Sequence, residues 1–193
     1  GVQNTLIGGL AGDSLTTAIQ NTAVGYAALS TNIDGDNNTA LGFKALEDFE
    51  ADTDGHGNNT AVGANAMSNA TTGTENTAVG TLAIGTGVTT GNSNVAVGYA
   101  AGYSLTTGTA NCIVGTNAGN ALTTATNNVA IGYAALSNEV AGPDNVAIGY
   151  FAMGSTDNAR ANVAIGYAAL QNLDYDSLTY SHNIGIGFNA GND

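Results

Sequence analysis

Short apolar runs recur along the chain, each led by Asn and interrupted by Gly. The run NVAIGYAAL at 128–136 returns letter for letter at 162–170, and NTAVGYAAL at 21–29 differs from it at two positions. Within each run β-branched residues alternate with a period of two until Gly breaks the pattern. This pattern predicts short strands rather than helices.

The runs belong to a repeat that fills the chain. With the Asn as position 1, eleven copies form a single repeat domain over residues 1–193, and successive copies start 17, 18 or 21 residues apart. Position 5 is always Gly, as in Gly25, Gly98, Gly132, Gly149 and Gly166, and position 8 is always Ala. The copies start at Asn4, Asn21, Asn38, Asn59, Asn76, Asn94, Asn111, Asn128, Asn145, Asn162 and Asn183.

Each copy predicts one rung of a solenoid. We expect a strand at positions 2–4, a bend at Gly, a second short strand near positions 6–9 and then a polar loop. One such unit cannot bury its own apolar side, but stacked units can. The sequence therefore predicts an all-β protein, a parallel β-solenoid (β-roll) of about eleven 17-residue rungs, roughly 50 Å long at about 4.8 Å per rung.

The constant residues are expected to be structural. Stacked Asn amides can hydrogen-bond along the axis as a ladder, and Gly supplies a conformation or a close approach that a Cβ forbids. A row of ligand-binding amides is the alternative interpretation of the Asn column.

Position 9 predicts one apolar slot per rung. Most copies place Leu, Met or Ile there, and four place Gly instead. Three of those four carry Leu at position 12: Leu15, Leu105 and Leu122. We expect the slot to be filled from either position, because a void forfeits packing energy.

The first strand of each copy is apolar on both faces, and such strands are usually covered on both. The interior covers one face, so we expect a partner surface, most simply another copy of the chain. The chain starts at Gly1 and stops at Asp193 without visible caps. We therefore expect either that the chain is a segment of a longer fibre or that subunits stack end to end into a filament.

Two further stripes of side chains are candidate interaction surfaces. Position 6 is aromatic in seven copies, including Tyr26, Tyr99, Tyr133, Tyr150 and Tyr167. This stripe either stiffens the rod and packs at an interface or stacks on surface glycan. Thr pairs recur on four consecutive copies, from Thr71–Thr72 to Thr123–Thr124, and a regular Thr array could bind ice.

The charge and the apolar pattern of the chain argue against several kinds of function. The net charge is −13 with two basic residues, so binding to nucleic acid is not expected. No run of 18 apolar residues exists, so membrane insertion is not expected either. Asp52 and Asp54 start like a calcium loop, but the twelfth position is Gly63 rather than Glu, which makes a weak candidate. No other metal site, no cofactor and no catalytic set can be assembled, and Cys112 is expected to be buried.

The runs NVAVG at 94–98 and NVAIG at 128, 145 and 162 resemble the head repeats of trimeric autotransporter adhesins. The longer form NTAVGYAAL also resembles repeats of phage tail-fibre proteins. The resemblance implies a trimeric, left-handed β-roll that serves as a surface fibre, located outside the cell, on the cell surface or on a virion. We therefore expect a non-enzymatic structural fibre that self-associates, with a glycan-binding or ice-binding module as the alternative.

Overall fold

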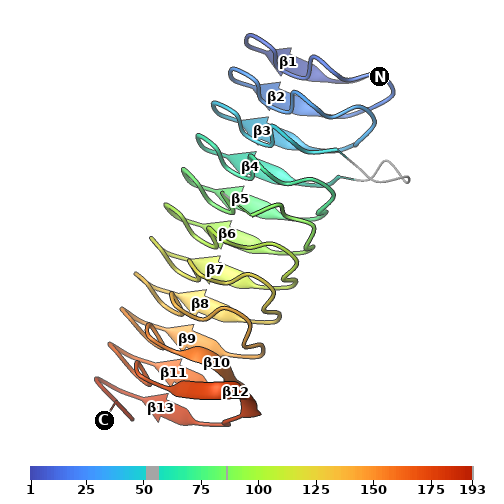
Figure 1. The fold of residues 1–193 in the computed structure, drawn as a ribbon. Coiled ribbons are helices and arrows are strands. Elements are labelled where there is room, and N and C mark those ends of the chain that lie inside the picture. Colours follow the sequence, from blue (N-terminus) through green and yellow to red (C-terminus); the bar gives the residue numbers. More distant parts are fainter. Residues whose placement is uncertain (51–56, 86, 193) are drawn as a thin grey trace.

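The computed structural model describes residues 1–50, 57–85 and 87–192, and for residues 174–180 it describes the backbone alone. Eleven short parallel strands stack into one sheet that runs the length of a rod, one strand per copy (Figure 1). The predicted all-β parallel solenoid is confirmed. Its strands are β1 (Thr5–Ile7), β2 (Thr22–Val24), β3 (Thr39–Leu41), β4 (Thr60–Val62), β5 (Thr77–Val79), β6 (Val95–Val97), β7 (Cys112–Val114), β8 (Val129–Ile131), β9 (Val146–Ile148), β11 (Val163–Ile165) and β13 (Ile184–Ile186).

The strands pair with equal positions opposite one another. Ala23 lies opposite Ala40, and the four extra residues of the 21-residue copies leave this register intact, because Thr39 still pairs with Thr60 and Val163 with Ile184. In the second of these copies the loop carries β12 (Asp174–Tyr180), which pairs in parallel with β10 (Asp157–Arg160) as a separate two-stranded sheet. Longer loops are thus accommodated beside the main sheet.

The expected second strand at positions 6–9 is absent from every copy, and turns take its place. Positions 7 and 9 have positive φ throughout, as in Ala134 at 51° and Leu136 at 54°. The N–H of Ala135, at position 8, donates to the carbonyl of Gly132 at 3.4 Å. A strand needs extended φ values, and alternate left-handed residues curl the chain back on itself instead.

Gly at position 5 is required for both of the reasons that the sequence suggests. Gly132 has φ of +132°, and a Cβ built on it would lie 2.5 Å from the carbonyl oxygen of Gly149 in the next rung. The left-handed backbone and the close approach of successive rungs each exclude a side chain.

The core is a narrow column of small and medium side chains. Ala at position 3 and Ala at position 8 line it, as do the residues at position 9, all fully or nearly buried within the stack. Leu122 fills the space next to Gly119, as expected, with its Cδ1 2.7 Å from where a Cβ of Gly119 would lie. The idea of a single slot is nevertheless wrong, because Leu46 and Phe49 occupy positions 9 and 12 of one copy and both are fully buried.

Candidate interaction surfaces

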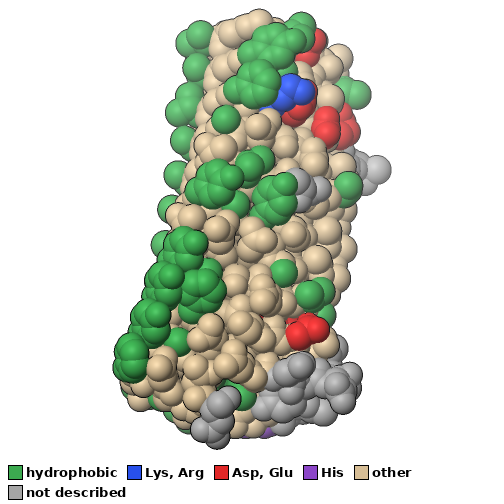
Figure 2. Space-filling model, turned by 60° about the vertical axis from the view of Figure 1, so that its left-hand side comes forward, with side chains coloured by type: hydrophobic (Ala, Val, Ile, Leu, Met, Phe, Trp, Pro, Cys, Tyr) green, Lys and Arg blue, Asp and Glu red, His purple; other side chains and the backbone are tan. Residues whose placement is uncertain are grey.

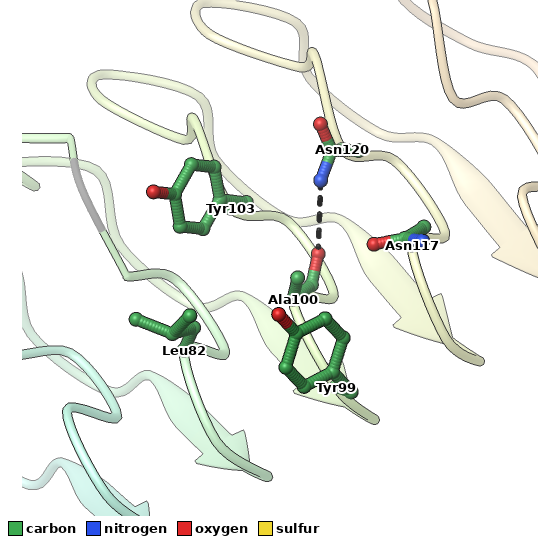
Figure 3. Close-up of a pocket in the computed structure, with 6 residues that line it drawn as sticks. All are labelled: Leu82, Tyr99, Ala100, Tyr103, Asn117 and Asn120. Carbon is green, nitrogen blue, oxygen red and sulfur yellow. Dashed lines mark hydrogen bonds between the residues drawn. The ribbon is translucent and has the colours of Figure 1, made fainter.

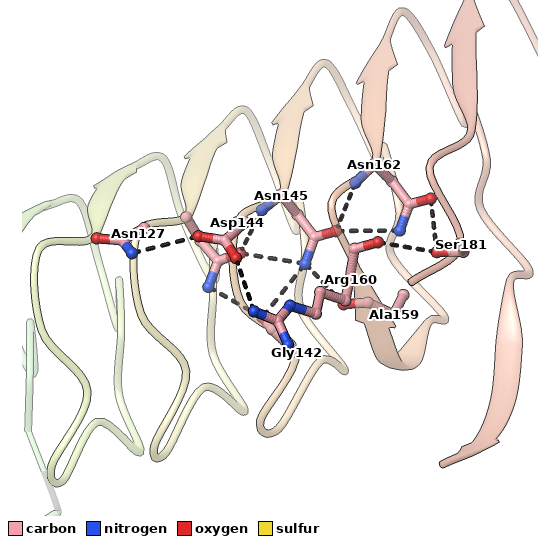
Figure 4. A network of polar contacts seen from close by, with 9 residues as sticks. Asn127, Gly142, Asp144, Asn145, Ala159, Arg160, Asn162 and Ser181 are labelled. Carbon is pink, nitrogen blue, oxygen red and sulfur yellow. Dashed lines mark hydrogen bonds and ion pairs between the residues drawn. The ribbon is translucent and has the colours of Figure 1, made fainter. Parts of the chain in front are cut away.

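The Asn column forms a continuous hydrogen-bond ladder. At all ten junctions the backbone N–H of one Asn donates to the Oδ1 of the Asn before it, as from Asn145 to Asn128 at 2.9 Å. At six junctions the side-chain amide donates to the same oxygen, as from Asn162 to Asn145 at 3.1 Å (Figure 4). The amide of Asn145 also donates to the carbonyl of Ala159 at 2.8 Å.

This ladder leaves little for a ligand to bind. Nine of the eleven Asn side chains, from Asn21 to Asn162, are at most 2 % exposed. Their oxygens accept from the next rung, and seven of the nine amides donate to a carbonyl of the loop in their own copy. The column therefore ties each rung to its neighbour and most rungs to their own loop. The structural interpretation of the column therefore accounts for its hydrogen bonds, and the ligand-binding alternative has no open groups in this buried stretch.

The outer face of the main sheet is apolar and exposed to solvent. Positions 2 and 4 point outward while Ala at position 3 points into the core, so Leu41 and Ile131 are 43 % and 37 % exposed although Ala40 is fully buried. Cys112, at position 2, is partly exposed on this face rather than buried. Every residue at these two positions is Thr, Val, Ile, Leu or Cys, so the face carries no charge.

The aromatic stripe divides into three groups. Tyr133, Tyr150 and Tyr167 stack on one another with ring centroids 5.2 and 5.1 Å apart, and Phe188 continues the stack at 5.0 Å. Phe151 packs its ring edge on that of Tyr150 at 4.8 Å, and Figure 2 shows the resulting apolar patch as a green run along one edge of the rod. These rings cover one another's faces.

Tyr26 and Tyr99 lie outside this stack. Tyr26 stacks on Phe43 at 5.8 Å near the first strands. Tyr99 has Thr81 and Thr116 as its neighbours at position 6, and its ring lines a hollow of about 200 Å³. The sequence places all five Tyr at one position, and Tyr99 is the one whose neighbours at that position on both sides are Thr.

In three of the four Thr pairs the first hydroxyl group is taken up by a hydrogen bond between rungs. The hydroxyl groups of Thr89, Thr106 and Thr123 donate to backbone carbonyls of the next rung at 3.0 to 3.1 Å, and Thr89 is fully buried. The first Thr of each of these pairs therefore joins rungs together, whereas the second, as in Thr90 and Thr107, is exposed.

Charged groups gather in the loops. Asp144 accepts from Arg160 at 3.5 Å and from Asn127 at 3.2 Å on the loop side of the ladder (Figure 4). Lys44 pairs with Glu47 at 3.0 Å, and this carboxylate raises the pKa of the Lys44 ammonium. These ion pairs are exposed and contribute little to stability.

Glu139 is a functional group of the core that the sequence pattern does not reveal. It stands at position 12, where five other copies have Leu or Phe, and it is fully buried. Its Oε1 accepts from the backbone N–H of Ala141, Gly142 and Asn158, and its Oε2 from that of Ala159 at 2.9 Å. Burial raises the pKa of this carboxyl, although the four N–H groups oppose the shift.

The weak calcium candidates, Asp52 and Asp54, lie outside the described residues. Within the described part of the chain, no group of three or more His, Cys, Asp or Glu side chains is arranged to hold a metal ion. Nor does that part contain a helix long and apolar enough to cross a bilayer. Comparison with protein-family models, with curated proteins and with solved structures finds no match for this chain.

Proposed function

We propose that this protein is a non-enzymatic structural fibre protein whose copies associate side by side through the outer face of the main sheet. One observation carries the proposal: a parallel sheet, a kind normally covered on both faces, here leaves a charge-free face of Val, Ile, Leu, Cys and Thr side chains at least partly exposed on every strand. Covering this face would remove its Val, Ile and Leu side chains from water, which favours association.

The spacing of the face favours another copy of the same chain as the partner. Each rung carries two outward residues, at positions 2 and 4, and their register is the same from β1 to β13. A partner with the same rung spacing can match every row of the face at once, whereas a partner without it matches only some rows. Three copies around one axis is the arrangement that the resemblance to adhesin heads and tail fibres implies.

The placement of charge is consistent with this association. Positions 1 to 9 carry no Asp or Glu in any copy, so the acidic residues all lie in the loop half of the repeat. Chains with a net charge of −13 repel one another. If the chains meet through the sheet face, their acidic loops point away from the contact. The distance between the acidic loops of different chains is then greatest.

The test is the absolute mass in solution, measured by light scattering after size exclusion. The expected mass is a multiple of 19.0 kDa, three chains for the trimer. The double variant Val62→Lys with Ile131→Lys places two charges on the outer face and should shift the mass to that of one chain. A stable monomer for the unchanged protein would contradict the proposal.

A matched control separates the face from added charge in general. Asn65→Lys with Asn189→Lys adds two Lys residues at position 7, where Lys44 already stands in its own copy. This variant should keep the mass of the unchanged protein. If both double variants dissociate equally, charge rather than the face governs assembly.

A further inference from the structure

The hollow beside Tyr99 interrupts the regularity of the rod. It lies across three successive copies and is open to solvent (Figure 3). Leu82 comes from one copy, Tyr99, Ala100 and Tyr103 from the next, and Asn117 and Asn120 from the third. These side chains stand at positions 6, 7 and 10, whereas the outer face of the sheet is built from positions 2 and 4.

Two departures from the repeat create the hollow. Tyr103 is the one aromatic residue at position 10 among the eleven copies, where Ser, Gly or a polar residue stands elsewhere. Tyr99 is flanked at position 6 by Thr81 and Thr116, so its ring lacks the neighbours that cover Tyr150 on both sides. One rung therefore presents two aromatic rings to the same space.

The opposite wall is polar and uncharged. Asn117 and Asn120 extend into the hollow from the next rung, and the amide of Asn120 donates to the carbonyl of Ala100 at 3.5 Å, a long bond (Figure 3). An amide both donates and accepts hydrogen bonds, as a hydroxyl group does. No Asp, Glu, Lys or Arg lines the hollow.

We propose that this hollow binds one hexopyranose unit of a neutral glycan. A pyranose ring has an apolar C–H face, which suits an aromatic wall, and a rim of hydroxyl groups, which suits a pair of amides. The lining contains no Lys or Arg and the net charge is −13, so the binding of anionic sugars such as sialic acid, uronic acids and phosphorylated sugars is disfavoured. This inference does not depend on the proposed self-association.

The test uses the full chain with three methyl β-pyranosides, those of glucose, galactose and mannose, in saturation-transfer NMR titrations. We expect at least one of them to bind with millimolar affinity. Tyr99→Thr and Tyr103→Ser should each weaken that binding by at least about fivefold, because each removes an aromatic contact worth about 1 kcal/mol or more. Asn117→Ala should weaken it as well.

The variants are chosen so that the fold tolerates them. Thr already stands at position 6, Ser at position 10 and Ala at position 7 of other copies, as in Thr116, Ser137 and Ala134. Tyr150→Thr is the matched control, because the faces of its ring are stacked between Tyr133 and Tyr167. It should leave sugar binding unchanged.

Three results would overturn the proposal. One is the absence of saturable binding of all three sugars up to about 50 mM, which is weaker than about −2 kcal/mol. A second is equal binding by Tyr103→Ser and the unchanged protein. A third is tighter binding of methyl glucuronide than of the neutral glucoside. Light scattering on each variant distinguishes a loss of sugar binding from a loss of assembly.

Discussion

Leu122 holds, from position 12 of its copy, the space that a side chain at Gly119 would otherwise occupy, with its Cδ1 2.7 Å from the place of the missing Cβ. Ile113 enters the same space from position 3, and its Cδ1 would lie 3.3 Å from that Cβ. The core of this rung is thus filled from position 12 and from position 3, and position 3 is Ala in eight of the eleven copies.

Removing this side chain should leave a void. Leu122→Ala is expected to lower the free energy of unfolding by about 3 kcal/mol, the usual cost of a buried cavity. Adding Gly119→Met reproduces the Met67–Ala70 pair of another copy and should recover part of the loss. Denaturant unfolding of the two single variants and the double variant measures the coupling, and strict additivity would contradict the shared space.

Replacing Gly in the bend should destabilise the stack strongly. Gly132→Ala places a Cβ 2.5 Å from the Gly149 oxygen at φ of +132°, and we expect a loss of more than about 3 kcal/mol. Gly187→Ala has φ of +125° but nothing within 4 Å of the new Cβ, so it should cost only about 1–3 kcal/mol. Equal losses in chemical denaturation would show that rung contact contributes nothing.

The Asn ladder should be sensitive at any buried rung. Asn128→Ala removes the acceptor for the N–H of Asn145 and the donor to the carbonyl of Gly142. The Gly142 carbonyl keeps its bond from the Asn145 amide at 3.2 Å, but the buried N–H of Asn145 loses its acceptor, and the loss of stability should be about 1–3 kcal/mol. The neighbouring control, Asn127→Ala, changes an exposed residue at a position where Ala161 stands in another copy, and it should alter stability by less than about 0.5 kcal/mol.

Stability should rise as the pH is lowered from 7. Burial raises the pKa of the carboxyl groups of Asp48, Glu50 and Glu139. In the window that begins at the usual pKa, 3.8 for Asp48 and 4.5 for the two Glu residues, and ends at the raised pKa of each group, the folded state binds more protons than the unfolded state. Stability is therefore lost as pH rises through this window and is regained on acidification.

Thermal unfolding at several pH values between 7 and 5 checks this direction. The melting temperature should increase on acidification, and Glu139→Gln should flatten that increase because it removes the most buried of the three carboxyl groups. A melting temperature that falls steadily between pH 7 and 5 would contradict the assigned direction.

Much of the architecture is readable from the repeat, because identical residues recur wherever rungs make identical contacts. The strand at positions 2–4, the Gly bend and the Asn ladder each follow from a constant residue with one physical use. The turn at positions 6–9 could not be predicted, because Leu136 and Ala134 adopt positive φ that their residue types rarely show. There the hydrogen bonds between rungs override local preference.

The variable positions are the ones that the pattern describes poorly. Glu139 occupies a position that Leu122 fills one copy earlier, and only the structure reveals four backbone N–H groups around its carboxylate. Likewise, Tyr103 is aromatic at a position where the other copies have Gly or a polar residue. Only the side chains of the neighbouring rungs show that it lines a hollow. Repetition identifies the scaffold, and the departures from repetition are where specific chemistry is found.

The unchanged register across loops of different length has an evolutionary consequence. Because four extra residues between Thr39 and Thr60 do not disturb strand pairing, a rung can be gained or lost in evolution as one unit. Duplication or deletion of one repeat in the gene would lengthen or shorten the rod by about 4.8 Å without disturbing the remaining rungs. Such a protein can adjust its reach in discrete steps, and the loops can diverge in sequence while the scaffold stays constant.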